Sequence, residues 1–195
     1  MRPFLLPFCF VCGFSGISAA QTAAWGLPQL MSGMAAVKTA SATFTERKTL
    51  PMLNAPLVET GTLSYAAPDW MEKITAGPAP ERFVLNGQKV TLTGGADGVH
   101  VFSLNDDPRI GGLAGGILAT LSGDLPALEQ VYAVRFSGGP AAWQLLLRPR
   151  DAGLARFISW LCISGSFNRI AAIDTASGNG GHSEMIVAET ASNAR

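Results

Sequence analysis

The stretch 61-GTLSYAAPDWMEKIT-75 contains two alternating segments joined by a proline. Apolar Leu63 and Tyr65 alternate with small polar residues, and a second alternation begins at Trp70. A period of two is typical of a β-strand with two different faces. Because proline lacks an N–H donor and keeps its predecessor extended, Pro68 predicts a corner between two antiparallel strands. The stretch therefore predicts antiparallel β structure, with apolar surface that serves either the core or a guest.

The composition limits the classes of function. The chain has 195 residues, which favours one domain. Its 14 basic and 14 acidic residues balance, so no charged surface for nucleic acid or an anionic membrane is expected. Charged residues make up 14% of the chain, well below the usual value of about a quarter. We therefore expect apolar surface that needs to be covered.

The first twenty residues have the pattern of a secretory signal peptide. Arg2 gives a positive start, residues 4–17 are mostly apolar, and 18-SAA-20 supplies small residues for cleavage before Gln21. An uncleaved membrane anchor is the alternative, which the shortness of the apolar run disfavours. We expect a soluble exported protein whose lone remaining cysteine, Cys162, packs as a small hydrophobe.

The rest of the chain predicts an α+β fold. Apolar residues at three- and four-residue steps predict an amphipathic helix over 27–40. A second helical region follows Pro108, with an apolar segment at 110–121 and a short helix capped by Asp124. Strands are predicted at 41–50, 57–66, 70–76, 81–86, 89–93, 98–104, 131–137, 142–149, 157–164, 168–175 and 183–189. We predict one large antiparallel sheet with helices on one face.

A sheet of about ten antiparallel strands curls. If helices cover its concave face, the space between the two layers is either filled by side chains or left as a cavity. The segment 110–121 is either a closely packed helix or a lid, and the lid is favoured. Its paired glycines permit close packing against a neighbour. They also cost the helix roughly 0.8–1 kcal/mol each relative to alanine, as a lid that opens would require.

Loosely spaced motifs run along the chain: 44-FTERK-48, 61-GTLSY-65, 68-PD-69, 80-PE-81, 84-VLNG-87, 121-LSGD-124, Trp143 and 147-LRPR-150. In order and spacing, the earlier motifs resemble the LolA-type periplasmic carriers of outer-membrane lipoproteins. The later ones resemble LolA-related proteins encoded beside genes for outer-membrane glycolipid or aryl-polyene synthesis. The resemblance covers nearly all of the mature chain, residues 21–195. It implies an incomplete β-barrel with a helical lid over a hydrophobic cavity for acyl chains.

The resemblance also implies the residues of the site. The lipid-binding cavity would be formed by Phe44, Leu63, Tyr65 and Met71. The lid would carry Leu30, Met31, Met34, Val37, Leu113, Ile117 and Leu121. Methionine suits such a wall because its unbranched thioether adapts to guests of variable shape. For Met31 and Met34, ordinary core packing is an equal alternative.

One position departs from the family pattern. Carriers of this type generally have an arginine directly before the corner proline, which helps to hold the lid closed, whereas this chain has Ala67. The resemblance therefore does not extend to that latch, and the cargo is either a lipoprotein or a lipid-linked intermediate of envelope assembly.

Signals for catalysis are few. The mature chain has His100 and His182 and no Gly-x-Ser-x-Gly elbow. In 181-GHSE-184, neighbouring residues of a strand would point to opposite faces, which argues against a nucleophile–base pair. No cysteine–histidine group has zinc spacing. The charged pairs 72-EK-73 and Arg148/Arg150 are interpreted as solvated surface. For Arg148 and Arg150, contact with a partner or an anionic head group is the alternative.

We therefore expect a monomeric, non-enzymatic periplasmic carrier that needs no cofactor. It would receive acylated cargo from an inner-membrane donor protein and pass it to an outer-membrane acceptor protein. Two alternatives remain: an envelope sensor that binds a lipid or lipoprotein without transporting it, and a hydrolase of acylated envelope molecules.

Overall fold

The computed structural model describes residues 25–77, 79–94 and 98–194. Within these ranges the chain forms one 11-stranded sheet and four helices. The predicted signal peptide, residues 1–20, lies outside the described residues. None of the helices in the described ranges has the length and apolar character needed to cross a membrane.

The sheet is built from two consecutive antiparallel meanders. The first comprises β1 (Val37–Thr49), β2 (Leu57–Ala66), β3 (Trp70–Ala76), β4 (Glu81–Asn86), β5 (Lys89–Gly94) and β6 (Val99–Ser103). The second comprises β7 (Tyr132–Gly139), β8 (Ala142–Pro149), β9 (Ile158–Ser166), β10 (Arg169–Ser177) and β11 (His182–Ala194).

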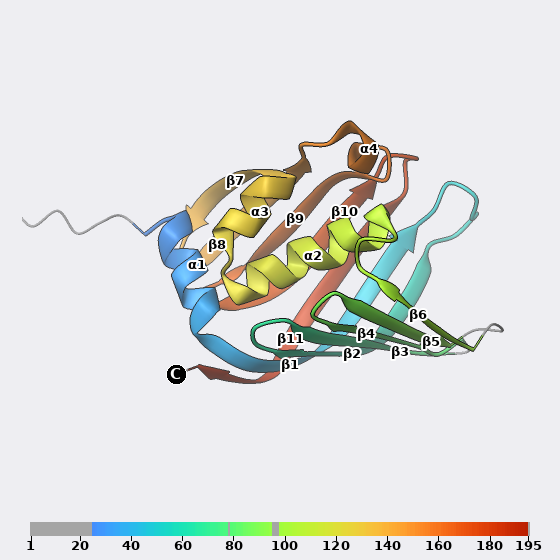
Figure 1. The fold of residues 1–195 in the computed structure, drawn as a ribbon, viewed down its shortest axis with the longest axis horizontal. Coiled ribbons are helices and arrows are strands. Elements are labelled where there is room, and N and C mark those ends of the chain that lie inside the picture. The colour runs from blue at the N-terminus through green and yellow to red at the C-terminus, as the bar shows by residue number, and fades with distance from the viewer. Residues whose placement is uncertain (1–24, 78, 95–97, 195) are drawn as a thin grey trace, which may run out of the picture.

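The two meanders meet where the last strand pairs with the first. The strand order is β6-β5-β4-β3-β2-β1-β11-β10-β9-β8-β7, so β6 and β7 are the outer strands. The sheet curves without closing, as Figure 1 shows. The predicted fold, an incomplete antiparallel barrel with helices over one face, is confirmed.

Three helices lie over the concave face of the sheet: α1 (Leu27–Ala36), α2 (Pro108–Ser122) and α3 (Leu125–Val131) (Figure 1). The long helix α2 begins at Asp107, whose carboxylate accepts a hydrogen bond from the Arg109 N–H at 2.9 Å. It ends at Gly123, whose φ of 69° is a left-handed conformation that glycine adopts without a Cβ penalty. Asp124 then caps α3, as predicted, by accepting from the Ala127 N–H at 3.0 Å.

Most predicted strand limits are close to the observed ones, and those of β2, β3, β4 and β8 coincide. The predicted helix over 27–40 is wrong beyond Ala36. Val37 has an extended backbone (φ −71°, ψ 120°) and opens β1, where β-branched residues fit the pleated ladder with β11. The short helix α4 (Ala152–Ala155) was not predicted. It is a single turn, and the Asp151 carboxylate caps it by accepting a hydrogen bond from the Leu154 N–H at 2.9 Å.

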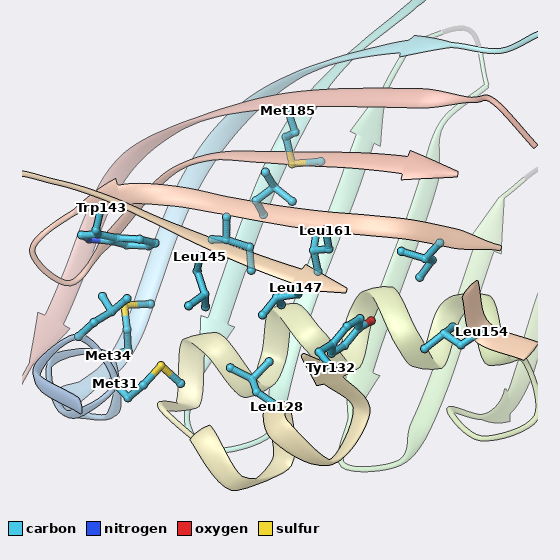
Figure 2. Packing of buried hydrophobic residues seen from close by; sticks show 14 of the residues in the cluster. Met31, Met34, Leu128, Tyr132, Trp143, Leu145, Leu147, Leu154, Leu161 and Met185 are labelled. Carbon is cyan, nitrogen blue, oxygen red and sulfur yellow. The ribbon is translucent and has the colours of Figure 1, made fainter. Parts of the chain in front are cut away.

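The main core lies mostly between the strands of the second meander and the helices over them, and Figure 2 shows its packing. Inward residues of β8 and β9, such as Leu145, Leu147 and Leu161, pack against α1, α3 and Tyr132. The buried Tyr132 hydroxyl donates to the Gly112 carbonyl at 2.7 Å and so ties α2 to this core. Burial raises the pKa of Tyr132 to about 12, which keeps the donor protonated. Cys162 in β9 is buried, but it lies outside this core, beside Gln144 and Asp174, so the predicted packing as a small hydrophobe is met only in its burial.

One of the two glycine pairs in α2, Gly112/Gly116, is explained by packing against this core. A Cβ on Gly112 would lie 2.6 Å from Leu154 Cδ1, and one on Gly116 would lie 3.2 Å from Leu161 Cδ2. Both glycines are buried. The glycine face of α2 therefore permits close packing on the sheet. That the helix also moves as a lid stays a prediction.

Candidate functional site

A cavity of about 430 Å³ lies between the concave face of the sheet and α2. This volume falls within the range of roughly 300–1,000 Å³ that is usual for small-molecule sites. Its apolar side chains come from both meanders and from two helices. They are Met34, Val37, Leu63, Tyr65, Met71, Phe83, Leu92, Ile110, Leu113, Ile117, Leu121, Ile170, Ile173, Met185 and Val187.

The alternation of the opening stretch explains how β2 and β3 build this wall. Tyr65 is paired with Met71, and Leu63 with Lys73, so these four side chains share the concave face. The proline corner between the strands is anchored by the Ala67 N–H, which donates to the Lys38 carbonyl at 2.8 Å. Leu63, Tyr65 and Met71, three of the four predicted cavity residues, line the cavity.

Phe44, the fourth predicted residue, does not line the cavity. It is buried in the main core, where it lies against Gly61 of the neighbouring strand. A Cβ on Gly61 would come within 2.7 Å of Phe44 Cε1 and 1.9 Å of the Ile74 carbonyl oxygen. The ring thus occupies space that only glycine leaves open, and the Lys73 ammonium lies over it, 4.8 Å from its centre.

The predicted lid residues divide into two groups. Leu113, Ile117 and Leu121 recur every four residues on α2 and all line the cavity, as do Met34 and Val37. Val37 does so from β1 rather than from the predicted helix. Leu30 and Met31 lie on α1 but are buried in the main core and do not line the cavity. Figure 2 shows Met31 beside Met34.

At one end of the cavity the wall is polar. There the Glu46 carboxylate accepts from the Lys73 ammonium at 2.5 Å and from the Ser183 hydroxyl, also at 2.5 Å. All three residues line the cavity, and Glu46 is only 6% exposed. We call Glu46, Lys73 and Ser183 the polar cluster.

Charge pairing favours the ionised form of Glu46. Burial raises the pKa of Glu46, but the charge and hydrogen bond of Lys73, together with Ser183 and Lys48, outweigh burial and hold this pKa below its ordinary value. Behind the cluster, Lys48 bonds to Glu59 at 2.7 Å. Burial alone would lower the pKa of Lys48. The hydrogen bond to Glu59 and the negative charges of Glu46 and Glu59 outweigh burial, so the pKa of Lys48 is raised. The cluster is thus a carboxylate and an ammonium that neutralise each other.

Sequence reasoning missed the polar cluster and interpreted 72-EK-73 as solvated surface. This interpretation is wrong for Lys73, which points inward, while Glu72 pairs with Arg82 at 2.5 Å. The period of two carried the signal, because Glu46 lies two residues from Phe44 and Lys73 two residues from Met71. Finding the pair also requires the register that brings β1 and β3 to opposite sides of β2.

Tyr65 contributes a polar atom elsewhere in the wall. Its hydroxyl is buried, and within the described part of the chain it has no hydrogen-bond partner. Burial, with a smaller contribution from the charge of Asp69, raises the pKa of Tyr65. The hydroxyl is therefore a neutral group that can both donate and accept.

The segment considered for catalysis is divided between the two faces of β11. His182 is exposed and lies beside Trp160, with ring centres 5.8 Å apart, whereas Ser183 lines the cavity and bonds to Glu46. The two side chains therefore do not form a nucleophile–base pair. Within the described ranges, no three histidine, cysteine or acidic side chains gather in a way that could hold a metal ion.

Several solved structures are similar in fold at low sequence identity. A LolA superfamily protein from Nitrosomonas europaea has 10% identity and a TM-score of 0.45, with 88% of this chain and 94% of that chain covered. A lipoprotein-sorting protein domain from Vibrio parahaemolyticus has 10% identity and a TM-score of 0.44, with coverages of 87% and 92%. The Pseudomonas aeruginosa MucA/MucB complex has 13% identity and a TM-score of 0.44, with coverages of 87% and 57%.

A search of curated proteins found no match. The family model described as outer membrane lipoprotein carrier protein LolA-like matches residues 18–195. This match spans the whole sheet, the helices over it and every residue of the cavity wall. The chain belongs to the LolA-like family of outer-membrane lipoprotein carrier proteins.

Proposed function

We propose that this protein is a periplasmic carrier that holds the acyl chain of a lipoprotein or envelope lipid in its cavity. It would take the cargo from an inner-membrane donor and deliver it toward the outer membrane. The observation that carries the proposal is the 430 Å³ apolar cavity beneath α2. Membership of the LolA-like family supports the carrier role and the location.

The chemistry of the wall suits an acyl chain. Transfer of a chain from water contributes roughly 0.8 kcal/mol per buried CH₂, so even a partly buried chain is held firmly and still released to a membrane. Three methionines line the cavity, Met34, Met71 and Met185. Their flexible thioethers allow chains of different shape to pack against the same wall.

The carrier proposal is tested by placing a charge in the wall. Met71→Glu is expected to weaken the binding of a fluorescent fatty-acyl probe at least about ten-fold, because the chain needs this volume dry. The melting temperature should fall only modestly, since the carboxyl group can raise its pKa or draw water into the cavity. Probe titration and thermal unfolding of one purified variant measure both quantities.

Ile74→Glu is the matched control, because Ile74 lies on the same strand and is exposed. It should leave both quantities near wild type. Unchanged probe affinity in a folded Met71→Glu protein would contradict the cavity as the binding site. Lipid extraction and mass spectrometry of protein purified natively from periplasm would then identify the cargo.

A further inference from the structure

The polar cluster lies at one end of a mostly apolar cavity wall, whose other polar lining residues include Ser41, Asn168 and Glu189. Glu46 lies opposite Glu59 in the β1–β2 ladder, six residues along β2 from Tyr65. At about 3.3 Å per residue, this places Glu46 roughly 20 Å along the strand from the Tyr65 level. Lys73 starts nearer, opposite Leu63, and its side chain reaches to Glu46. Apolar Leu63 and Val187 line the cavity between these two levels, whereas Met185 lies opposite Glu46, at the level of the cluster. A single chain lying along the strands would therefore meet the polar cluster at one end only.

We propose that the polar cluster is a head-group site, which binds an uncharged hydroxyl or amide group attached to the acyl chain. This inference rests on the proposed carrier function and specifies the ligand class of the same cavity. It assigns the chain a direction, with the polar head against Glu46, Lys73 and Ser183 and the tail toward Met34 and Val37.

The hydrogen-bonding capacity of the cluster matches such a head group. An ammonium has three N–H donors, and one of those of Lys73 is used by Glu46. The Ser183 hydroxyl donates to Glu46 and keeps its own lone pairs as acceptors. The cluster therefore offers donors from Lys73 and an acceptor from Ser183. A hydroxyl or a primary amide can satisfy both at once.

The charges disfavour an anionic head group. The ammonium of Lys73 is already neutralised by Glu46, and Arg109, the other cation in the wall, is paired with Asp107 at 2.6 Å. Glu81 adds a further carboxylate to the lining. An ionised carboxylate or phosphate would therefore enter beside acidic groups whose nearest cations are already engaged.

The Lys73 side chain is the part of the polar cluster that is accessible to a ligand. Gly61 makes room for Phe44, and the Lys73 side chain passes over that ring to reach Glu46. Lys73 keeps 25% of its side chain exposed, against 8% for Glu46. The carboxylate is thus enclosed by its partners, and the ammonium is the part of the cluster that a guest can contact.

The test uses three twelve-carbon lipids that differ only in the head: 1-monolaurin, laurate and methyl laurate. Each displaces a fluorescent fatty-acyl probe from the purified protein. Wild type should bind monolaurin about ten-fold more tightly than methyl laurate or laurate, because one or two added hydrogen bonds to a charged group are worth about that factor. Ser183→Ala and the double variant Glu46→Gln/Lys73→Met should lose this preference and keep their affinity for methyl laurate.

The double variant removes both charges together, so no unpaired charge is left buried. Ser183→Ala, a small change in one strand, keeps the test available if the double variant does not fold. Ser159→Ala on the exposed face of β9 is the matched control and should retain the preference.

Each outcome decides one of the two proposals. Equal affinity of wild type for the three lipids, or a preference that survives Ser183→Ala, would overturn the head-group site and leave the carrier function standing. Tighter binding of laurate than of monolaurin would overturn the uncharged class. Failure to bind any of the three, methyl laurate included, would overturn the acyl-binding cavity and the head-group site with it.

Discussion

The chain has two tyrosines, and their hydroxyls are in opposite situations. That of Tyr132 donates to the Gly112 carbonyl, whereas that of Tyr65 is buried without a partner among the described residues. A buried hydroxyl without a partner costs its desolvation free energy, about 1–3 kcal/mol. Tyr65 therefore lowers stability in the empty protein, and its hydroxyl is available to a guest in the cavity.

Tyr65→Phe should raise the free energy of unfolding of the empty protein by about 1 kcal/mol, since the ring stays and the unpaired hydroxyl goes. For a domain of this size, the melting temperature should rise by about 2–4 °C. Tyr132→Phe, the matched control, should lower it by a similar amount, because the Gly112 carbonyl loses its donor. Destabilisation by Tyr65→Phe would mean that the hydroxyl has a partner in solution.

Glu46 should make stability depend on acid pH. Its pKa in the folded state lies below its ordinary value of 4.5, so its contribution is fully present above about pH 4.5 and is lost as the pH falls through the lower, folded pKa. Denaturant unfolding between pH 7 and pH 3 should show wild type losing stability more steeply than Glu46→Gln/Lys73→Met. Parallel losses would indicate that the carboxylate is not held by Lys73 in solution.

For single residues, the sequence predicts which face of a strand a side chain occupies better than it predicts which distant side chain it contacts. Alternation placed Leu63 and Tyr65 on one face of β2, the resemblance added Met71 from β3, and all three line the cavity. The family resemblance implied Phe44 as a further cavity residue, but its ring packs over Gly61 in the main core and does not line the cavity. The contact of Lys73 with Glu46 joins residues 27 positions apart, and local pattern contains no information about such a register.

Among the elements, α2 has two different glycine environments. Gly112 is buried against Leu154 and Ile158, whereas a Cβ on Gly115 would meet nothing within 4 Å. The helix thus gains close packing at one glycine, and at the other it bears the entropic cost of glycine without any contact in return.

Gly115→Ala should stabilise the protein by up to about 1 kcal/mol through helix propensity alone. Gly112→Ala should destabilise it by about 1–3 kcal/mol, because the new methyl group would lie 2.6 Å from Leu154 Cδ1 and force the core to shift. Denaturant unfolding of the two variants measures both changes. Equal effects of both substitutions would contradict the close packing of α2 on the sheet.

The elements themselves were predictable where local signals were strong. Turn residues and alternation located β2, β3, β4 and β8 to the residue, and the Asp124 cap located α3. The end of α1 was not predictable, because the apolar stripe continues through Val37 while the backbone leaves the helix to pair with β11. That choice depends on a strand about 150 residues later in the chain.

At the scale of the whole molecule, the β1–β11 ladder joins the two meanders and makes the cavity a shared structure. Tyr65 and Met71 come from the first meander, and Ile173, Met185 and Val187 from the second. Each meander alone would expose half of an apolar wall to water. The two should therefore unfold together, in one cooperative transition.

A guest that bridges the meanders should stabilise this single transition. Methyl laurate at 100 times its dissociation constant should raise the free energy of unfolding by about 2.7 kcal/mol, which corresponds to roughly 5–11 °C in melting temperature for a domain of this size. Far-ultraviolet circular dichroism and tryptophan fluorescence should report the same midpoint with and without the lipid. Met71→Glu should melt in one transition that the lipid shifts much less, because its wall no longer excludes water. Two separate transitions, with the lipid shifting only one of them, would place the binding site within one meander and contradict a cavity shared by both.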